Sequence, residues 1–243
     1  MSDYPPSQKL WRYMSFSRFM WLLQRKLLWI GRSDTLDDPW ELAITPTYLE
    51  EVRLRAPITP IGQEHRETAD EHAAKVYGHW RRTTFISCWC ASEHESHALW
   101  RVFCGDKEGV AIQTTVGRLE AHFGNVALRK VRYAEPKALG RTLTLDDVAI
   151  LKRPFFDFEK EARAIFRDDT PNPKLDKGEF GFRFPFDPAE VLESVAIHPG
   201  ADISFYETVL WAIDDHAKPL RDNVSWSSMR ERPPLQKPLP YPK

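Results

Sequence analysis

The sequence has few cysteines and almost no net charge, whereas many cysteines would mark a secreted protein and a strong positive charge a nucleic-acid-binding one. Its 243 residues include 3 cysteines and 11 glycines. A small, odd number of cysteines argues against a disulfide-stapled secreted fold and indicates a reducing cytoplasm. The net charge is −1, so the composition gives no strong signal for binding nucleic acid or a membrane surface.

Long apolar runs are also missing. The longest apolar stretch, residues 19–30, is interrupted by Gln24, Arg25 and Lys26, which argues against a membrane span. The residues after Met1 lack a basic segment followed by an apolar run, so no signal peptide is expected. The sequence therefore predicts a cytoplasmic protein without membrane contact.

The remaining composition is that of a globular protein, with 42% hydrophobic and 28% charged residues and a high content of 9 tryptophans. Residues 1–8 are expected to form a flexible arm and residues 9–231 a single α+β domain. Residues 232–243 contain five prolines and are expected to form an extended tail. The chain shows no internal repeat, which favours one domain.

Turn residues and hydrophobic periods predict short strands and helices in irregular alternation, not a strict strand-helix-strand rhythm. Strands are expected at residues 10–13, 27–30, 83–90, 109–114, 129–133, 159–166 and 191–197. Helices are expected at residues 15–25, 64–81, 97–103, 116–123, 145–152 and 203–218. This pattern predicts a mixed sheet with flanking helices.

Three distant stretches carry side chains suited to an anionic, sugar-containing ligand. Arg12 stands in a Leu-Trp-Arg-Tyr stretch, Ser87 in an aromatic strand, and Glu159 and Glu161 in a Glu-x-Glu pair. A guanidinium holds phosphate or ribose oxygens with its planar fork, and a carboxylate stabilises positive charge that develops on a sugar ring. If the two glutamates share one strand, they lie on one face, about 6.6 Å apart along the strand. We expect these side chains to converge on one pocket.

A longer series of motifs resembles the landmarks of a bacterial family of uncharacterised domains, the domain-of-unknown-function family DUF 2971. The resemblance covers roughly residues 10–228 and implies no established activity. The motifs, in order, are Leu10-Trp11-Arg12-Tyr13, Leu36-Asp37-Asp38-Pro39-Trp40-Glu41, Ile86-Ser87-Cys88-Trp89 with Leu99-Trp100, Glu108-Gly109-Val110-Ala111-Ile112, Lys130-Val131-Arg132-Tyr133 and Glu159-Lys160-Glu161-Ala162-Arg163.

The order Arg12, Ser87, Glu161 is also similar to the arginine-serine-glutamate pattern of ADP-ribosyltransferases. This resemblance implies a split sheet and NAD as the substrate, with Glu161 stabilising the charged ribose and Glu159 orienting or deprotonating an acceptor. Arg12 and Ser87 would bind the nucleotide. The central element departs from the usual Ser-Thr-Ser, because Ser87 is followed by Cys88-Trp89.

The resemblance implies an NAD-dependent transferase or NAD glycohydrolase, such as a toxin or defence effector with an unknown macromolecular acceptor. Tyr13 and Trp89 are candidate contacts for the cofactor, and Trp11 and Trp100 are further candidates for stacking on a ring. The alternative is a non-catalytic nucleotide- or protein-binding domain, in which Arg12 pairs with the glutamates. A nuclease is a third, weaker alternative.

Two other groups of residues resemble ligand sets but fit other roles better. Asp37 and Asp38 precede Pro39, where a turn or capping role is more common than a ligand role. The spacing of four possible metal ligands does not match zinc sites, so no metal is expected. Those residues are Cys88, Cys90, His94 and His97.

Overall fold

The computed structural model describes residues 1–36, 38, 40–43, 45–55, 68–105, 107–124, 126–135, 144–168 and 176–233. The strands are β1 (Lys9–Ser15), β2 (Leu27–Arg32), β3 (Thr84–Ala91), β4 (Gly109–Thr115), β5 (Leu128–Lys130), β6 (Arg132–Tyr133), β7 (Leu151–Lys152), β8 (Glu161–Arg167), β9 (Asp176–Gly178), β10 (Gly181–Pro185), β11 (Ser194–Ile197) and β12 (Val224–Trp226). The α-helices are α1 (Phe16–Arg25), α2 (Pro46–Arg55), α3 (Ala69–Thr83), α4 (His97–Phe103), α5 (Val116–His122), α6 (Leu145–Ala149), α7 (Pro188–Val191) and α8 (Ile203–His216).

The main sheet branches at β3. On one edge of β3, strand β8 pairs antiparallel over the whole length from Thr84 to Cys90, and β5 continues the sheet beyond β8. The other edge is shared, because β2 pairs only at Phe85 and Ile86 while β1 pairs only at Cys90 and Ala91. From β1 the sheet continues through β4 and β11 to β12, and from β2 through β10 to β9.

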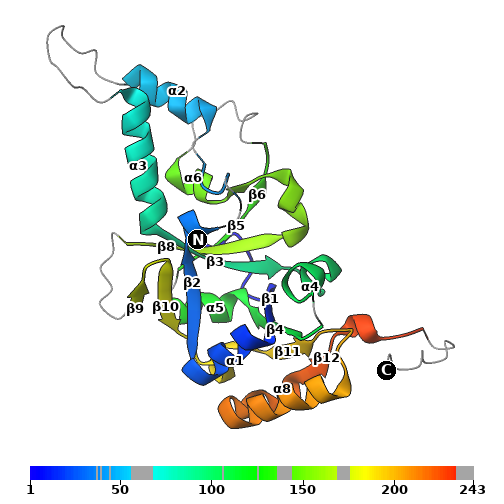
Figure 1. Cartoon of the computed structure of the whole chain (residues 1–243). Helices are drawn as coiled ribbons and strands as arrows, with labels where there is room; N and C mark the ends of the chain where they lie inside the picture. The colour runs from blue at the N-terminus through cyan, green and yellow to red at the C-terminus, as the bar shows by residue number, and fades with distance from the viewer. Residues whose placement is uncertain are drawn as a thin grey trace, which may run out of the picture.

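This branching leaves a split in the sheet. Ser87, Cys88 and Trp89 lie between the β1 ladder and the β2 ladder, on the edge of β3 that neither ladder occupies. α1 connects β1 to β2 and spans the split (Figure 1). The α+β fold class with a split sheet, which the ADP-ribosyltransferase resemblance implied, is therefore confirmed.

Helices cover both faces of the sheet. The larger core lies under α1, α5 and α8, which bury the side chains of Phe19, Leu119 and Val209 against the sheet. On the other face α4 packs on β1 and β4 through Trp100, and α3 and α6 cover the end of β3. Figure 1 shows α3 running from the end of β3 outward to α2, at the end of the molecule opposite to α8. Within the described part of the chain, no helix combines the length and apolar character needed to cross a bilayer.

The N-terminal residues are in contact with the rest of the domain. The first residues, expected to form a loose arm, make contacts: Asp3 donates a backbone hydrogen bond to Leu128, Gly117 donates one to Pro6, and Tyr4 packs against the core. Most of the proline-rich tail, residues 234–243, lies outside the described residues. Its independence from the domain stays a prediction.

Candidate functional site

Arg12 bridges the split. Its Nη1 donates to Ser87 Oγ on β3 at 3.3 Å, and its Nη2 donates to the Trp29 carbonyl on β2 at 3.4 Å. Ser87 is fully buried and also accepts a hydrogen bond from Trp89 Nε1 at 3.0 Å. A side chain on β1 thus connects β1 to both other strands where backbone pairing is interrupted, and burial lowers the pKa of Arg12.

A pocket of about 420 Å³ opens at this split, beside α1. It has a cationic and aromatic lining, in which three arginines and two tryptophans are combined with a few apolar side chains. This combination suits a ligand that carries both negative charge and a flat ring. The lining residues are Arg12, Tyr13, Met14, Ser17, Arg18, Trp21, Leu22, Leu27, Leu28, Trp29 and Arg183.

The expected convergence of three residues on this pocket is wrong, because Arg12 is the one member of the three that lines it. Residues paired across an antiparallel ladder point to the same face, and Cys90 pairs with both Glu161 and Trp11. Arg12 is one residue beyond Trp11, so it points to the opposite face, the one that carries Ser87. Arg12 and Ser87 therefore meet, while the Glu161 side chain lies on the other face of the sheet.

Glu161 nevertheless shares its face with part of the pocket. When the β2 register, in which Gly31 faces Ile86, is continued across the split, Trp29 comes opposite Cys88. Cys88 lies two residues along β3 from Cys90, the ladder partner of Glu161, so it shares the face of Glu161. The face thus runs from Trp29 across Cys88 to Glu161.

Glu161 is 3% exposed and sits in a cluster of buried charges. The Arg163 guanidinium donates two hydrogen bonds to the Glu161 carboxylate, Nε to Oε1 at 2.8 Å and Nη2 to Oε2 at 3.0 Å. Lys152 Nζ lies 3.0 Å from Oε2. Arg163 also pairs with Glu41. Burial alone would raise the pKa of Glu161, but Arg163 and Lys152 lower it to about 2, so the carboxylate is ionised.

Glu159 does not extend the β8 strand, and the expectation of two glutamates on one strand was wrong. It ends a 3₁₀ turn, η3 (Pro154–Glu159), and Lys160 then adopts a left-handed conformation with φ 43° before β8 begins. The two carboxylates still approach each other, because Lys152 Nζ also lies 2.5 Å from Glu159 Oε2. Burial raises the pKa of Glu159, and Lys152 opposes that shift.

The predicted aromatic contacts are mostly parts of the core. Trp89 is buried in the larger core. Tyr13 is among the pocket-lining residues, but its hydroxyl accepts a hydrogen bond from the Ser96 amide at 2.6 Å and its ring packs on Trp100. Trp11 and Trp100 are buried, with their ring N–H groups bonded to Ser92 and Glu95.

Sequence reasoning missed Arg18, Trp21, Trp29 and Arg183 in the pocket and Lys152 beside the glutamates. Trp29 stands in a stretch that is apolar throughout, so only the structure shows that it is exposed between buried Leu28 and Ile30. Arg183 and Lys152 gave no signal either, because only the fold brings them to the site.

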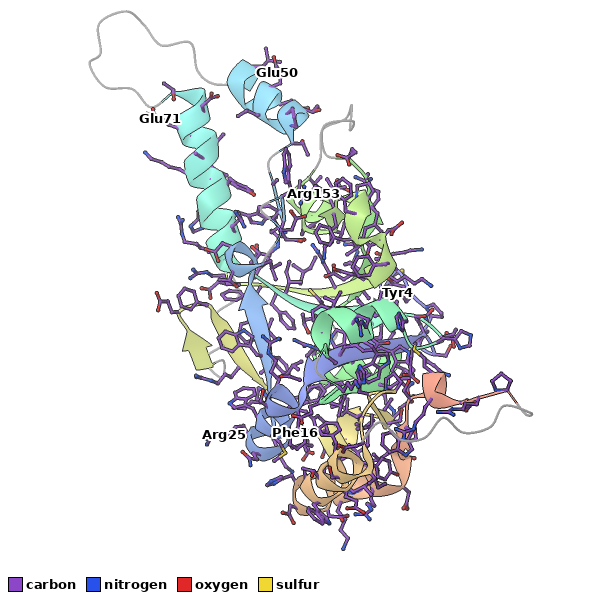
Figure 2. The ribbon with its side chains drawn as sticks, turned by 45° about the vertical axis from the view of Figure 1, so that its right-hand side comes forward. Tyr4, Phe16, Arg25, Glu50, Glu71 and Arg153 are labelled. Atoms are coloured by element: carbon purple, nitrogen blue, oxygen red, sulfur yellow. The ribbon has the colours of Figure 1, made fainter. Side chains whose placement is uncertain are left out.

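The other candidates have structural roles. Asp38 is buried and pairs with Arg153 at 2.7 Å, and Asp37 lies outside the described residues. Figure 2 shows Arg153 well apart from Phe16 and Arg25, the two ends of α1, so this ion pair is remote from the helix that borders the pocket. Among the residues that the structure describes, no three His, Cys, Asp or Glu side chains are grouped as metal ligands.

Comparison with known proteins identifies neither a family nor a curated relative. No family model matches the sequence, so the DUF 2971 resemblance stays a prediction, and no curated protein matches it. Among solved structures, the chain is similar to Thermus sp. 2.9 DarT in complex with ADP-ribosylated ssDNA, with 12% identity, a TM-score of 0.43 and coverage of 96% of this chain and 100% of that chain. DarT in complex with NAD⁺ gives 12% identity, a TM-score of 0.42 and coverage of 94% and 100%.

Proposed function

We propose that this chain binds NAD or a related nucleotide at the split of its sheet and cleaves the nicotinamide–ribose bond, as an ADP-ribosyltransferase-like enzyme. The observation that carries the proposal is the pocket of about 420 Å³ lined by Arg12, Arg18, Arg183 and two tryptophans. A dinucleotide has a diphosphate for the guanidinium groups and flat rings for the indoles.

The chemistry requires a carboxylate that is charged. When the bond between ribose C1′ and the nicotinamide nitrogen breaks, its electron pair leaves with nicotinamide and positive charge develops on the sugar ring. A fixed negative charge near that ring stabilises the transition state more than the ground state. Glu161 is held ionised and lies on the same face as Trp29 and Cys88, which makes it the candidate for this role.

An acceptor completes the reaction. A hydroxyl group or water attacks C1′ and loses its proton, and Glu159 is the candidate base because burial raises its pKa. Attack by water makes the chain an NAD glycohydrolase, whereas attack by a macromolecule makes it a transferase, with a toxin or defence role.

A second candidate function is non-catalytic binding of the same nucleotide, or of a protein. The observation that favours it is the saturation of the Glu161 carboxylate by Arg163 and Lys152 at 3% exposure. For Glu161 to approach a ribose, Arg163 or Lys152 has to give up a hydrogen bond to the Glu161 carboxylate and bind the ligand in its place.

Nicotinamide release from NAD separates the two candidates. Glu161→Gln keeps the size of the side chain and removes its charge, so an enzyme is expected to lose about 100- to 1000-fold in rate. Glu41→Gln is the matched control, because it removes another carboxylate of the Arg163 cluster. If both variants lose the same activity and melt equally early, Glu161 is a structural partner of Arg163. If the wild type binds NAD by calorimetry without releasing nicotinamide, the binding function stands and the enzyme does not.

A further inference from the structure

Trp29 is unusual among the tryptophans near the split, because much of its surface faces solvent. It is 37% exposed on β2, between the buried residues Leu28 and Ile30, and it lines the pocket. A partly exposed indole in a pocket offers ring surface to a flat ligand.

Three glycines form the surface around this indole. A Cβ atom added at Gly181 would stand 2.5 Å from Cζ2 and 2.8 Å from Cε2 of Trp29, closer than real Cβ contacts, as well as 2.4 Å from the Ile30 carbonyl. A Cβ at Gly178 would stand 3.5 Å from Cη2, and one at Gly31 would stand 3.9 Å from Nε1. The indole therefore lies against bare backbone of β2, β9 and β10.

The backbone conformation does not account for these glycines. Among the described residues, Gly124 is the glycine with a positive φ, so none of the three beneath Trp29 occupies the left-handed region. At Gly181 the Trp29 indole and the Ile30 carbonyl leave no room for a Cβ, whereas a Cβ at Gly178 or Gly31 would make ordinary contacts. Gly181 thus lets the Trp29 indole pack directly on the backbone of β10.

Arginine side chains that can bind the phosphate groups of a nucleotide lie near Trp29. Arg183 is the ladder partner of Trp29, and the Arg12 guanidinium donates to the Trp29 carbonyl. Arg18 joins them in the pocket lining. A ring that stacks on Trp29 therefore has its phosphate groups within a cationic environment.

We propose that Trp29 is the stacking platform for the heteroaromatic ring of the bound nucleotide, with Gly181 leaving the room that the indole needs against the backbone. This inference rests on the proposed nucleotide-binding function and adds to it the residue that selects a ring-bearing anion over a simple phosphate. Trp11, Trp89 and Trp100 are buried and leave no comparable ring face to a ligand.

Calorimetric titration of the purified chain with ADP, NAD and inorganic pyrophosphate tests the platform. The wild type is expected to bind ADP at least 10-fold more tightly than pyrophosphate, because pyrophosphate has no ring. Stacking of a base on an aromatic side chain is worth about 1–3 kcal/mol, so Trp29→Leu is expected to weaken ADP and NAD binding about 5- to 150-fold and to leave pyrophosphate unchanged. Trp29→Phe is expected to recover most of the affinity.

Trp211→Leu is the control, because it removes a tryptophan that is 67% exposed on α8 and outside the pocket lining. Equal affinity of the wild type for ADP and pyrophosphate would overturn the platform even if no variant folds. Unchanged ADP binding by folded Trp29→Leu would overturn it too, while the proposed nucleotide site would remain. Absence of binding of all three probes to the wild type would overturn both proposals.

Discussion

Ser87 shows how one small side chain supports the geometry of the split. Its Oγ accepts from Arg12 and from Trp89, and both donors are then satisfied in a part of the protein with little water. Ser87 thus acts through Arg12, which ties β1 to β2 and β3. The resemblance to ADP-ribosyltransferases assigned both residues to ligand binding, whereas the structure shows them first as a brace for the pocket.

Removing the Ser87 hydroxyl is therefore expected to affect both stability and binding. In Ser87→Ala the Arg12 and Trp89 donors lose a shared acceptor, and a buried donor without a partner costs about 1–3 kcal/mol of unfolding free energy. Chemical denaturation measures this loss. Ser225→Ala removes an exposed strand serine from β12 and is expected to change stability by less than about 0.5 kcal/mol. Equal stability of both variants would show that the brace contributes little.

At the scale of elements, the sequence predicted most of the strands and helices near the split. The helix expected at residues 15–25 is α1, the strand expected at 83–90 is β3, and the helix expected at 97–103 is α4. These elements were readable because apolar side chains recur at strand or helix spacing and serine residues precede the helices. α2, β9, β10 and β12 were not predicted, since they are short or lack a clear hydrophobic period.

The candidate site was harder to predict than the elements that carry it. The order β8, β3, β1 did bring Glu161, Ser87 and Arg12 onto adjacent strands. Which face each side chain takes depends on register, and register depends on long-range pairing that a single sequence does not encode locally. A shift of one residue separates the face of Ser87 from that of Cys88.

The turn between η3 and β8 offers a test at this scale. Lys160 holds φ 43° and is exposed, a conformation that costs a side chain with Cβ about 1 kcal/mol and glycine almost nothing. Lys160→Gly is therefore expected to leave the unfolding free energy unchanged or to raise it by up to about 1 kcal/mol. Lys130→Gly, at an exposed strand position in β5, is expected to lower it by about 0.5–1 kcal/mol. A clear loss of stability in Lys160→Gly would contradict this explanation of the turn.

At the scale of the whole molecule, the proline-rich end is expected to be dispensable. Five prolines in residues 232–243 remove amide donors that a packed segment would use, so a chain ending at Glu231 is expected to melt within a few degrees of the full chain. Thermal unfolding followed by circular dichroism compares the two. A drop of many degrees would mean that the tail packs on the domain.

Acid stability of the whole molecule depends on the buried charges around Glu161. Because its pKa is lowered to about 2 in the folded chain, below the ordinary 4.5, Glu161 contributes stability that is fully present above about pH 5 and is lost as the pH falls toward 2. Glu41 and Glu159 act in the opposite direction, since burial raises the pKa of each, and they offset part of the loss.

Urea unfolding between pH 7 and pH 3 measures this contribution. The stability gap between the wild type and Glu161→Gln is expected to be widest at pH 7 and to shrink as the pH falls below 5, because protonation removes from the wild type the charge that the variant already lacks. Glu231→Gln changes an exposed glutamate near the end of the described chain, and its gap is expected to stay small throughout. If the stability gap for Glu161→Gln does not change with pH, the ion pairs with Arg163 and Lys152 do not stabilise the fold. The buried carboxylate would then have no structural reason, which would strengthen its assignment to catalysis.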